Sequence, residues 1–191
     1  KDGAGTLTLA NTNNEVGPSG LVLINNGTLA LGTNNALAAN RAVAVNGGTL
    51  DIGGYDNTVG AVTLTNGTIA GTTGVLTGTS YAVEGGTISA RLGGGGALTK
   101  SGLGTVTLSG SNSYSGNTTI AGAGGILRLT SVNSLSANTV LVGSGSSATI
   151  ATLDLASSGN YVANSYGSSS SSGSSMFFSA SSGSDTTLTF T

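Results

Sequence analysis

Apolar and polar residues alternate in four eleven-residue segments in the first half of the chain. The segments are LVLINNGTLAL (residues 21–31), AVAVNGGTLDI (42–52), AVTLTNGTIAG (61–71) and SYAVEGGTISA (80–90). An alternation with a period of two is typical of a β-strand with one buried face. The Asn-Gly or Gly-Gly step in the middle of each segment suits a tight turn, because glycine adopts positive φ at little cost. Each segment therefore predicts two short strands joined by a corner.

The four segments also repeat one another column by column. They begin at residues 21, 42, 61 and 80, so their starts lie about 20 residues apart. When they are aligned, the shared columns are glycine, threonine and large aliphatic residues: Gly27, Gly48, Gly67 and Gly86; Thr28, Thr49, Thr68 and Thr87; Leu29, Leu50, Ile69 and Ile88. Coils stacked in parallel place each residue about 4.8 Å from its equivalent, which favours the same residue type in every coil. The columns predict an all-β fold, a parallel β-helix or β-solenoid with rungs of about 20 residues.

An Asn-Gly step is also the strongest short-range sequence signal for a β-hairpin with a two-residue turn. An antiparallel β meander or sandwich is therefore the alternative fold. Hairpins constrain residues across each turn and do not require identical columns from copy to copy. The columns favour the β-helix.

A longer repeat contains the shorter one. KDGAGTLTLANTN (residues 1–13) aligns with KSGLGTVTLSGSN (100–112) at an offset of 99, and GTLAL (27–31) aligns with GILRL (125–129). We predict one β-solenoid over residues 1–155, built of two related super-repeats of about 99 residues (1–99, and 100–155 onward). Residues 156–191 are rich in serine, with Met176, Phe177 and Phe178 as candidate core anchors. This part predicts an irregular end that forms further rungs or a cap.

The composition narrows the classes of partner. Only 6% of the 191 residues are charged, 37% are hydrophobic, and cysteine, histidine and tryptophan are absent. The net charge is −2 and the five cations are dispersed, which argues against a nucleic-acid partner. The chain has no apolar run long enough for a transmembrane helix, so we expect no membrane span in this segment.

Catalysis on glycans would require paired carboxylates on adjacent coils of one face. The acidic residues are Asp2, Glu15, Asp51, Asp56, Glu84, Asp154 and Asp185. In the aligned columns Asp51 falls beside Ala30 and Ala70, and Glu84 falls beside Thr65 and Asn46, so neither has an acidic partner. Asp51 and Asp56 could approach each other across a corner, where solvated carboxylates are the simpler interpretation. Histidine, cysteine and the spaced aspartates of a calcium loop are missing. We expect no catalytic, metal or cofactor site.

One stretch resembles a known family. KSGLGTVTLSGSNSYSGNTTIAGAGGILRL (residues 100–129), followed by NSLSAN, is similar to the autotransporter-associated β-strand repeat, also called the passenger-associated transport repeat. The matching residues are Lys100, Gly102, Gly104, Thr105, Thr107, Leu108, Asn112, Tyr114, Gly116, Thr118, Thr119, Leu127 and Leu129. The first copy departs from the pattern, with Glu15 in place of Tyr114 and Pro18 in place of Asn117. The resemblance implies a right-handed parallel β-helix, exported by a Gram-negative bacterium and located outside the cell or on its outer-membrane surface.

We therefore expect a non-enzymatic structural protein that acts as a stalk, adhesin passenger or fibre element. A carbohydrate- or surface-binding module that uses exposed threonine, asparagine and tyrosine is the alternative, and a glycan-active enzyme is less favoured. The first rung has no cap, because Lys1 is followed at once by the strand-like GTLTL (residues 5–9). A host or environmental surface or glycan is one candidate partner. The uncapped rung leaves two interpretations open: the sequence is part of a longer passenger, or the TTLTF (186–190) of a second copy pairs with this first rung to form filaments.

Overall fold

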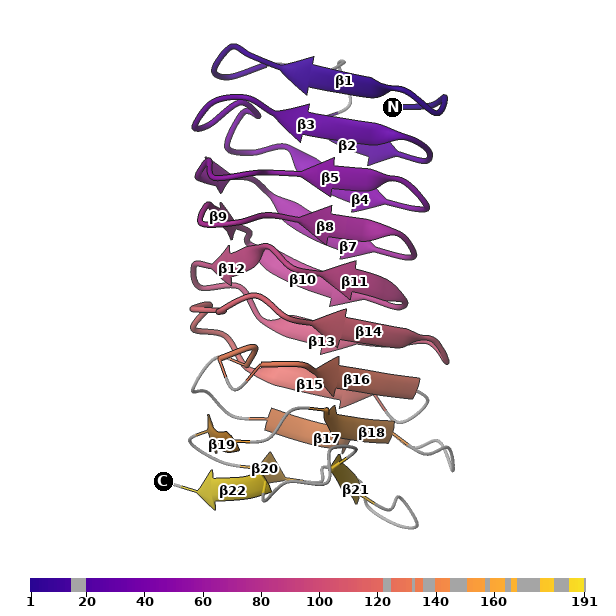
Figure 1. Cartoon of the computed structure of the whole chain (residues 1–191), viewed down its shortest axis with the longest axis vertical. Helices are drawn as coiled ribbons and strands as arrows, with labels where there is room; N and C mark the ends of the chain where they lie inside the picture. The colour runs from indigo at the N-terminus through magenta and orange to yellow at the C-terminus, as the bar shows by residue number, and fades with distance from the viewer. Residues whose placement is uncertain are drawn as a thin grey trace.

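The computed structural model describes residues 1–14, 20–121, 125–131, 133–135, 140–144, 151–156, 159–163, 166–167, 176–180 and 186–190. Side chains are described up to residue 140 and over residues 151–156. The described residues form strands and corners and no helix, and the coils stack along one axis with the N-terminus at one end (Figure 1).

Two long parallel sheets form the walls of the stack. The first contains, in spatial order, β1 (Thr6–Leu9), β3 (Thr28–Leu31), β5 (Thr49–Asp51), β8 (Thr68–Ala70), β11 (Gly86–Ile88), β14 (Thr105–Leu108), β16 (Gly125–Leu129), β18 (Ala151–Leu155) and β21 (Met176–Ala180). The second contains β2 (Leu21–Ile24), β4 (Ala42–Val45), β7 (Ala61–Leu64), β10 (Ser80–Val83), β13 (Leu98–Lys100), β15 (Thr118–Ala121), β17 (Val140–Ser144) and β20 (Tyr166–Gly167). Successive strands of one sheet belong to successive coils.

All the strand pairings are parallel, and they join equivalent residues of neighbouring coils. Leu29 pairs with Leu50, Leu50 with Ile69, and Ile69 with Ile88. The prediction of a β-solenoid with turns about 20 residues apart is confirmed. The antiparallel alternative is wrong, because the Asn-Gly steps join two different sheets and not two partners in one hairpin.

The apolar positions of the four alternating segments form the core. In the second sheet they are Val22, Ile24, Val43, Val45, Val62, Leu64, Tyr81 and Val83. After the corner, within the strands of the first sheet or directly behind them, they are Leu29, Leu31, Leu50, Ile52, Ile69, Ile88 and Ala90. All are buried in one continuous cluster. The threonine column faces outward, where Thr28, Thr49 and Thr68 are partly exposed neighbours in register. Burial of aliphatic area, at about 25 cal/mol per Å², is the main force that holds one coil on the next.

The glycine column is explained by the close approach of successive corners. A Cβ atom on Gly48, Gly67 or Gly86 would lie less than 3.0 Å from the carbonyl oxygen of the equivalent glycine in the preceding coil. Gly67 and Gly86 also have φ values of 101° and 112°. Only glycine allows the corners to stack this closely.

Two short sheets complete the strands. β6 (Asn57–Thr58), β9 (Val75–Thr77) and β12 (Arg91–Gly93) form a third wall in the middle coils, which the prediction of two strands per coil missed. β19 (Gly159–Ala163) pairs with β22 (Thr186–Phe190) near the C-terminal end. β20 and β21 extend the two long sheets beyond Ala156. The side chains of Met176, Phe177 and Phe178 lie outside the described part, as do residues 168–175, Glu15 and Pro18, so their expected roles stay predictions.

Candidate functional site

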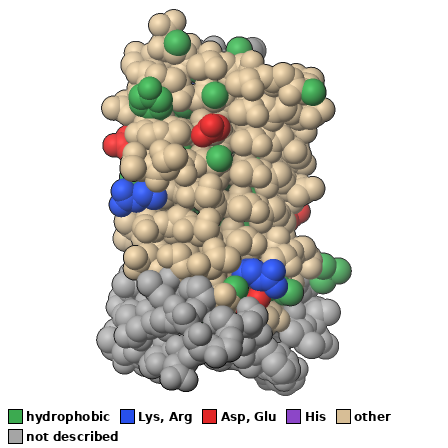
Figure 2. All heavy atoms as spheres, viewed as in Figure 1, with side chains coloured by type: hydrophobic (Ala, Val, Ile, Leu, Met, Phe, Trp, Pro, Cys, Tyr) green, Lys and Arg blue, Asp and Glu red, His purple; other side chains and the backbone are tan. Residues whose placement is uncertain are grey.

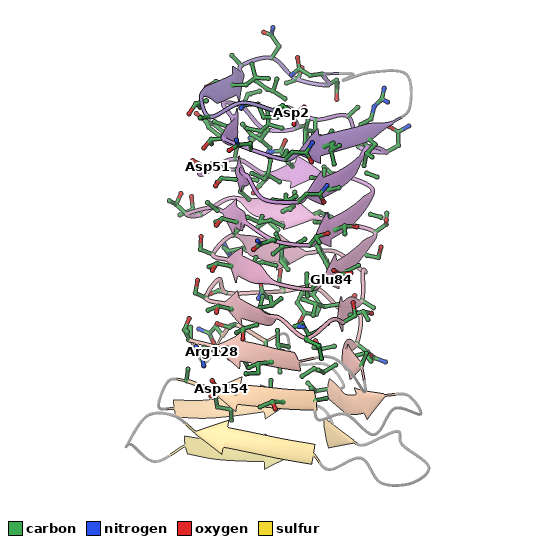
Figure 3. All side chains as sticks on the ribbon, turned by 90° about the vertical axis from the view of Figure 1, so that its right-hand side faces the viewer. Asp2, Asp51, Glu84, Arg128 and Asp154 are labelled. Carbon is green, nitrogen blue, oxygen red and sulfur yellow. The ribbon has the colours of Figure 1, made fainter. Side chains whose placement is uncertain are left out.

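The carboxylates are distributed along the stack and support its corners. Asp51 Oδ1 accepts a hydrogen bond from the Gly53 N–H at 2.9 Å, and Asp56 Oδ1 accepts one from the Val75 N–H at 2.8 Å. Asp2, Asp51 and Glu84 lie at different heights along the axis (Figure 3). Asp51 therefore binds the backbone of its own corner, and Asp56 binds the backbone of the next coil. Glu84 has no stacked acidic neighbour, because Val83 pairs with Leu64 and Lys100, and the residues that follow these two are Thr65 and Ser101.

Lys100 lies in the core, although the ammonium group of a lysine is usually exposed to water. It occupies the aliphatic column of the second sheet, between Val83 and Ile120, and its side chain is 0% exposed. Its Nζ donates to the carbonyl oxygens of Ser101 at 2.6 Å and Gly102 at 2.8 Å. Burial lowers the pKa of Lys100 to about 8, an effect that the negative charge of Glu84 partly opposes.

Lys1 repeats this arrangement at the start of the chain. Its Nζ donates to the carbonyl oxygens of Gly3 at 2.7 Å and Asn26 at 3.2 Å. The Lys-x-Gly opening of both copies therefore brings an ammonium group to the carbonyl oxygens of the corner that follows it. A signal was present in the sequence, because Lys100 stands where the preceding segments have valine or leucine.

The buried tyrosines are structural. The Tyr81 hydroxyl accepts a hydrogen bond from the Gly78 N–H at 2.7 Å and lies 2.6 Å from the Gly93 carbonyl oxygen, to which it donates. Tyr114, from the Asn-x-Tyr motif, shares a 2.7 Å hydrogen bond with the Thr118 hydroxyl, and its ring centre lies 5.9 Å from that of Tyr81. Burial raises the pKa of Tyr81. Both rings fill the coil interior and are closed to a ligand.

The ion pair between Arg128 and Asp154 joins neighbouring coils. Arg128 Nε lies 2.7 Å from Asp154 Oδ2, and the two residues face each other in the register of β16 and β18. The Arg128 side chain is 43% exposed, whereas that of Asp154 is 6% exposed. The pair is labelled near the C-terminal end in Figure 3, and it supports the stacking of these coils.

Two grooves open on the side of the stack. One, of about 410 Å³, lies at the glycine corner and is lined by Thr65, Asn66, Glu84, Gly102, Leu103 and Thr105, among others. The other, of about 370 Å³, is lined by Thr72, Thr73, Ser89, Arg91, Ser109 and Ser111 around Gly110. Figure 2 shows that charged side chains are few on the face it presents. Such grooves offer hydrogen-bond donors and acceptors, but neither brings two carboxylates together for acid–base catalysis.

Within the described ranges, no group of three histidine, cysteine or acidic residues is placed to hold a metal ion. The same part of the chain contains no helix that is long and apolar enough to cross a membrane.

Comparisons with known proteins agree with the repeated motif. Residues 1–31 and 98–129 match the family model of the passenger-associated-transport-repeat. Searches of curated proteins and of solved structures found no match. The two matched stretches are those that place Lys1 and Lys100 at glycine corners and β1 and β14 directly after them. The chain is therefore a β-solenoid in which two stretches match the passenger-associated transport repeat.

Proposed function

We propose that the chain is a non-enzymatic rod in an autotransporter passenger-like protein, acting as a stalk or fibre element outside a Gram-negative cell. The observation that carries this proposal is the unbroken stack of in-register columns, in which the aliphatic column runs from Leu29 through Leu50, Ile69 and Ile88 to Leu108. The passenger-associated repeat fits a structural passenger-like role. The buried and paired polar side chains described above hydrogen-bond to corners or join neighbouring coils, which agrees with a structural role.

The N-terminal end of the rod has a surface that suits a further coil. In the middle of the stack, β14 is covered by β11, and its Val106 is 0% exposed. β1 is the equivalent strand of the first repeat, and it ends its sheet. Its Leu7, which corresponds to Val106, is 48% exposed beside a hollow of about 230 Å³ that Leu21 and Leu29 also line. An uncovered strand edge with an exposed apolar residue favours pairing with another strand.

In the isolated 191-residue chain, the strand that covers β1 comes from a second copy. The TTLTF segment expected to make this contact is β22, which pairs with β19 in a separate two-stranded sheet. β21 takes its place in the proposal, because it ends the sheet of β1 at the opposite end of the stack and all strands of that sheet run in one direction. Adding β1 of one copy to β21 of another therefore continues the parallel sheet. This contact is head-to-tail and does not close on itself, so it generates filaments.

Electron microscopy of the isolated chain tests this proposal. We expect long unbranched fibres, and we expect Leu7→Lys to abolish them because it places a charge on the stacking surface. Leu103→Lys is the matched control, since Leu103 is 80% exposed at a lateral corner and should tolerate the same change. Circular dichroism checks that both variants keep their β-structure. A monomer at high concentration by light scattering, or fibres that survive Leu7→Lys, would contradict the stacking.

A further inference from the structure

The groove around Arg91 arises from a difference in corner length. Residues 71–74 separate β8 from β9, but only Ser89 and Ala90 separate β11 from β12 in the next coil. The shorter corner is recessed between residues 72–74 of the coil before it and residues 109–111 of the coil after it. The groove of about 370 Å³ lies at this recess.

The Arg91 guanidinium bridges the recess. Its Nε donates to the Ser111 carbonyl oxygen at 3.3 Å, and its Nη1 donates to the Thr73 carbonyl oxygen at 3.4 Å. These two carbonyl groups belong to the corners on either side, so the side chain is held across three coils. A guanidinium carries more N–H groups than these two bonds use, and the remaining N–H groups are available to a ligand.

The lining of the groove is suited to negatively charged oxygen atoms. Five residues with hydroxyl groups line the groove together with Arg91, namely Thr72, Thr73, Ser89, Ser109 and Ser111, and no carboxylate lines it. Asp51 and Asp56 belong to the corner two coils before Arg91, where Asp51 accepts a hydrogen bond from the Gly53 N–H and Asp56 accepts one from the Val75 N–H. Arginine binds carboxylate and sulfate groups through paired charge-assisted hydrogen bonds, and hydroxyl groups add neutral donors beside them.

We propose that this lateral groove binds the carboxylate or sulfate group of an acidic polysaccharide, with Arg91 as the anion-binding residue and the surrounding hydroxyl groups as sugar contacts. The groove lies on the side of the stack, so an extended polymer can lie along it without disturbing the coil ends. The proposal does not depend on filament formation, since the groove lies within a single chain.

The site can be tested with three polymers that share the same polysaccharide chain: carboxymethyl dextran, dextran sulfate and unmodified dextran. Binding of the full chain is measured by calorimetry at moderate ionic strength, where unspecific attraction between distant charges is screened. We expect binding to one or both charged polymers and none to neutral dextran. The carboxymethyl and sulfate arms decide which anion the groove prefers.

Two groove variants and one matched control complete the test. Arg91→Gln removes the charge, and Thr73→Asp places a carboxylate on an exposed groove position while it leaves Arg91 in place. Each should weaken binding about tenfold or more, because the anion loses its charged partner or meets a like charge. Thr65→Asp makes the same change at an exposed position of the other groove and should bind as the parent does.

Thermal unfolding shows whether each variant is folded. If Arg91→Gln unfolds, Thr73→Asp still decides the question, since it does not remove the bridge to Ser111 and Thr73. Three results would overturn the proposal: equal binding to neutral dextran, no binding to either charged polymer, or equal losses in Thr73→Asp and Thr65→Asp. Absence of binding to both charged polymers would mean that Arg91 only bridges the short corner.

Discussion

At the scale of single residues, a different physical effect explains each of the aligned columns of aliphatic, threonine and glycine residues. The aliphatic column lies inside the coil and loses contact with water, the threonine column stays outside, and the glycine column allows successive corners to approach. Leu50 is fully buried between Leu29 and Ile69, whereas the adjacent Thr49 is partly exposed between Thr28 and Thr68. The two neighbours in sequence therefore differ sharply in what they contribute to stability.

Leu50→Ala should lower the free energy of unfolding by about 2–5 kcal/mol, because it removes buried apolar area and leaves a cavity. Thr49→Ala should change it by about 1 kcal/mol or less, since the hydroxyl is on the outer face. Urea unfolding followed by circular dichroism compares the two variants with the parent. Equal losses in both would show that the inward and outward assignments are wrong.

At the scale of elements, the corners explain both what the sequence could predict and what it could not. The first corner of each coil was predictable because the Asn-Gly or Gly-Gly step recurs at a fixed place between two alternating strands. The second corner was not, because its length changes from coil to coil and the short strands β6, β9 and β12 carry no repeated pattern. The recess around Arg91 depends on that change in length, so no motif marks it.

The corner after β13 shows a second reason why sequence patterns were insufficient. A lysine usually keeps its charge in water, so the Lys-x-Gly motif does not mark Lys100 as part of the core. Its aliphatic stem continues the column between Val83 and Ile120, while its ammonium group reaches the Ser101 and Gly102 carbonyl oxygens. A buried ammonium group is costly unless it is hydrogen-bonded, and the carbonyl oxygens of the corner supply those bonds.

The lowered pKa of Lys100 predicts that stability rises with pH above pH 8. Its folded-state pKa is about 8 and its ordinary value is 10.5, so between these values the unfolded chain binds more protons than the folded chain. The free energy of unfolding should then rise by at most about 1.4 kcal/mol per pH unit. Tyr81, whose pKa is raised above 10.0, acts in the opposite direction at higher pH, so the useful window ends near pH 10.

Urea unfolding between pH 7.5 and pH 9.5 measures this slope. Lys100→Met keeps most of the aliphatic volume and removes the titrating group, so its unfolding free energy should be nearly independent of pH across the window. A parent protein without the slope, or a variant that keeps it, would contradict the assignment of the effect to Lys100.

At the scale of the whole molecule, the described coils form a rod in which each coil adds one strand to each long sheet. The sequence predicted this architecture because the same columns recur in every coil and only in-register stacking requires that. It did not predict the lateral groove or the buried ammonium group, which depend on how corners of unequal length meet in space. The proposed end-to-end contact follows from the same architecture, since β1 and β21 end one parallel sheet.

The most direct test of the rod is a set of distances along its outer threonine column. Thr6, Thr28, Thr49, Thr68, Thr87 and Thr107 are successive neighbours in register. The chain has no cysteine, so paired spin labels can be attached at cysteines introduced at Thr107 and at Thr49, Thr28 or Thr6. Pulsed electron paramagnetic resonance should give separations near 14, 19 and 24 Å, increasing by about 4.8 Å for each coil. Increments of about 10 Å, as two strands per repeat in an antiparallel meander would give, or separations that do not increase evenly, would contradict the β-solenoid.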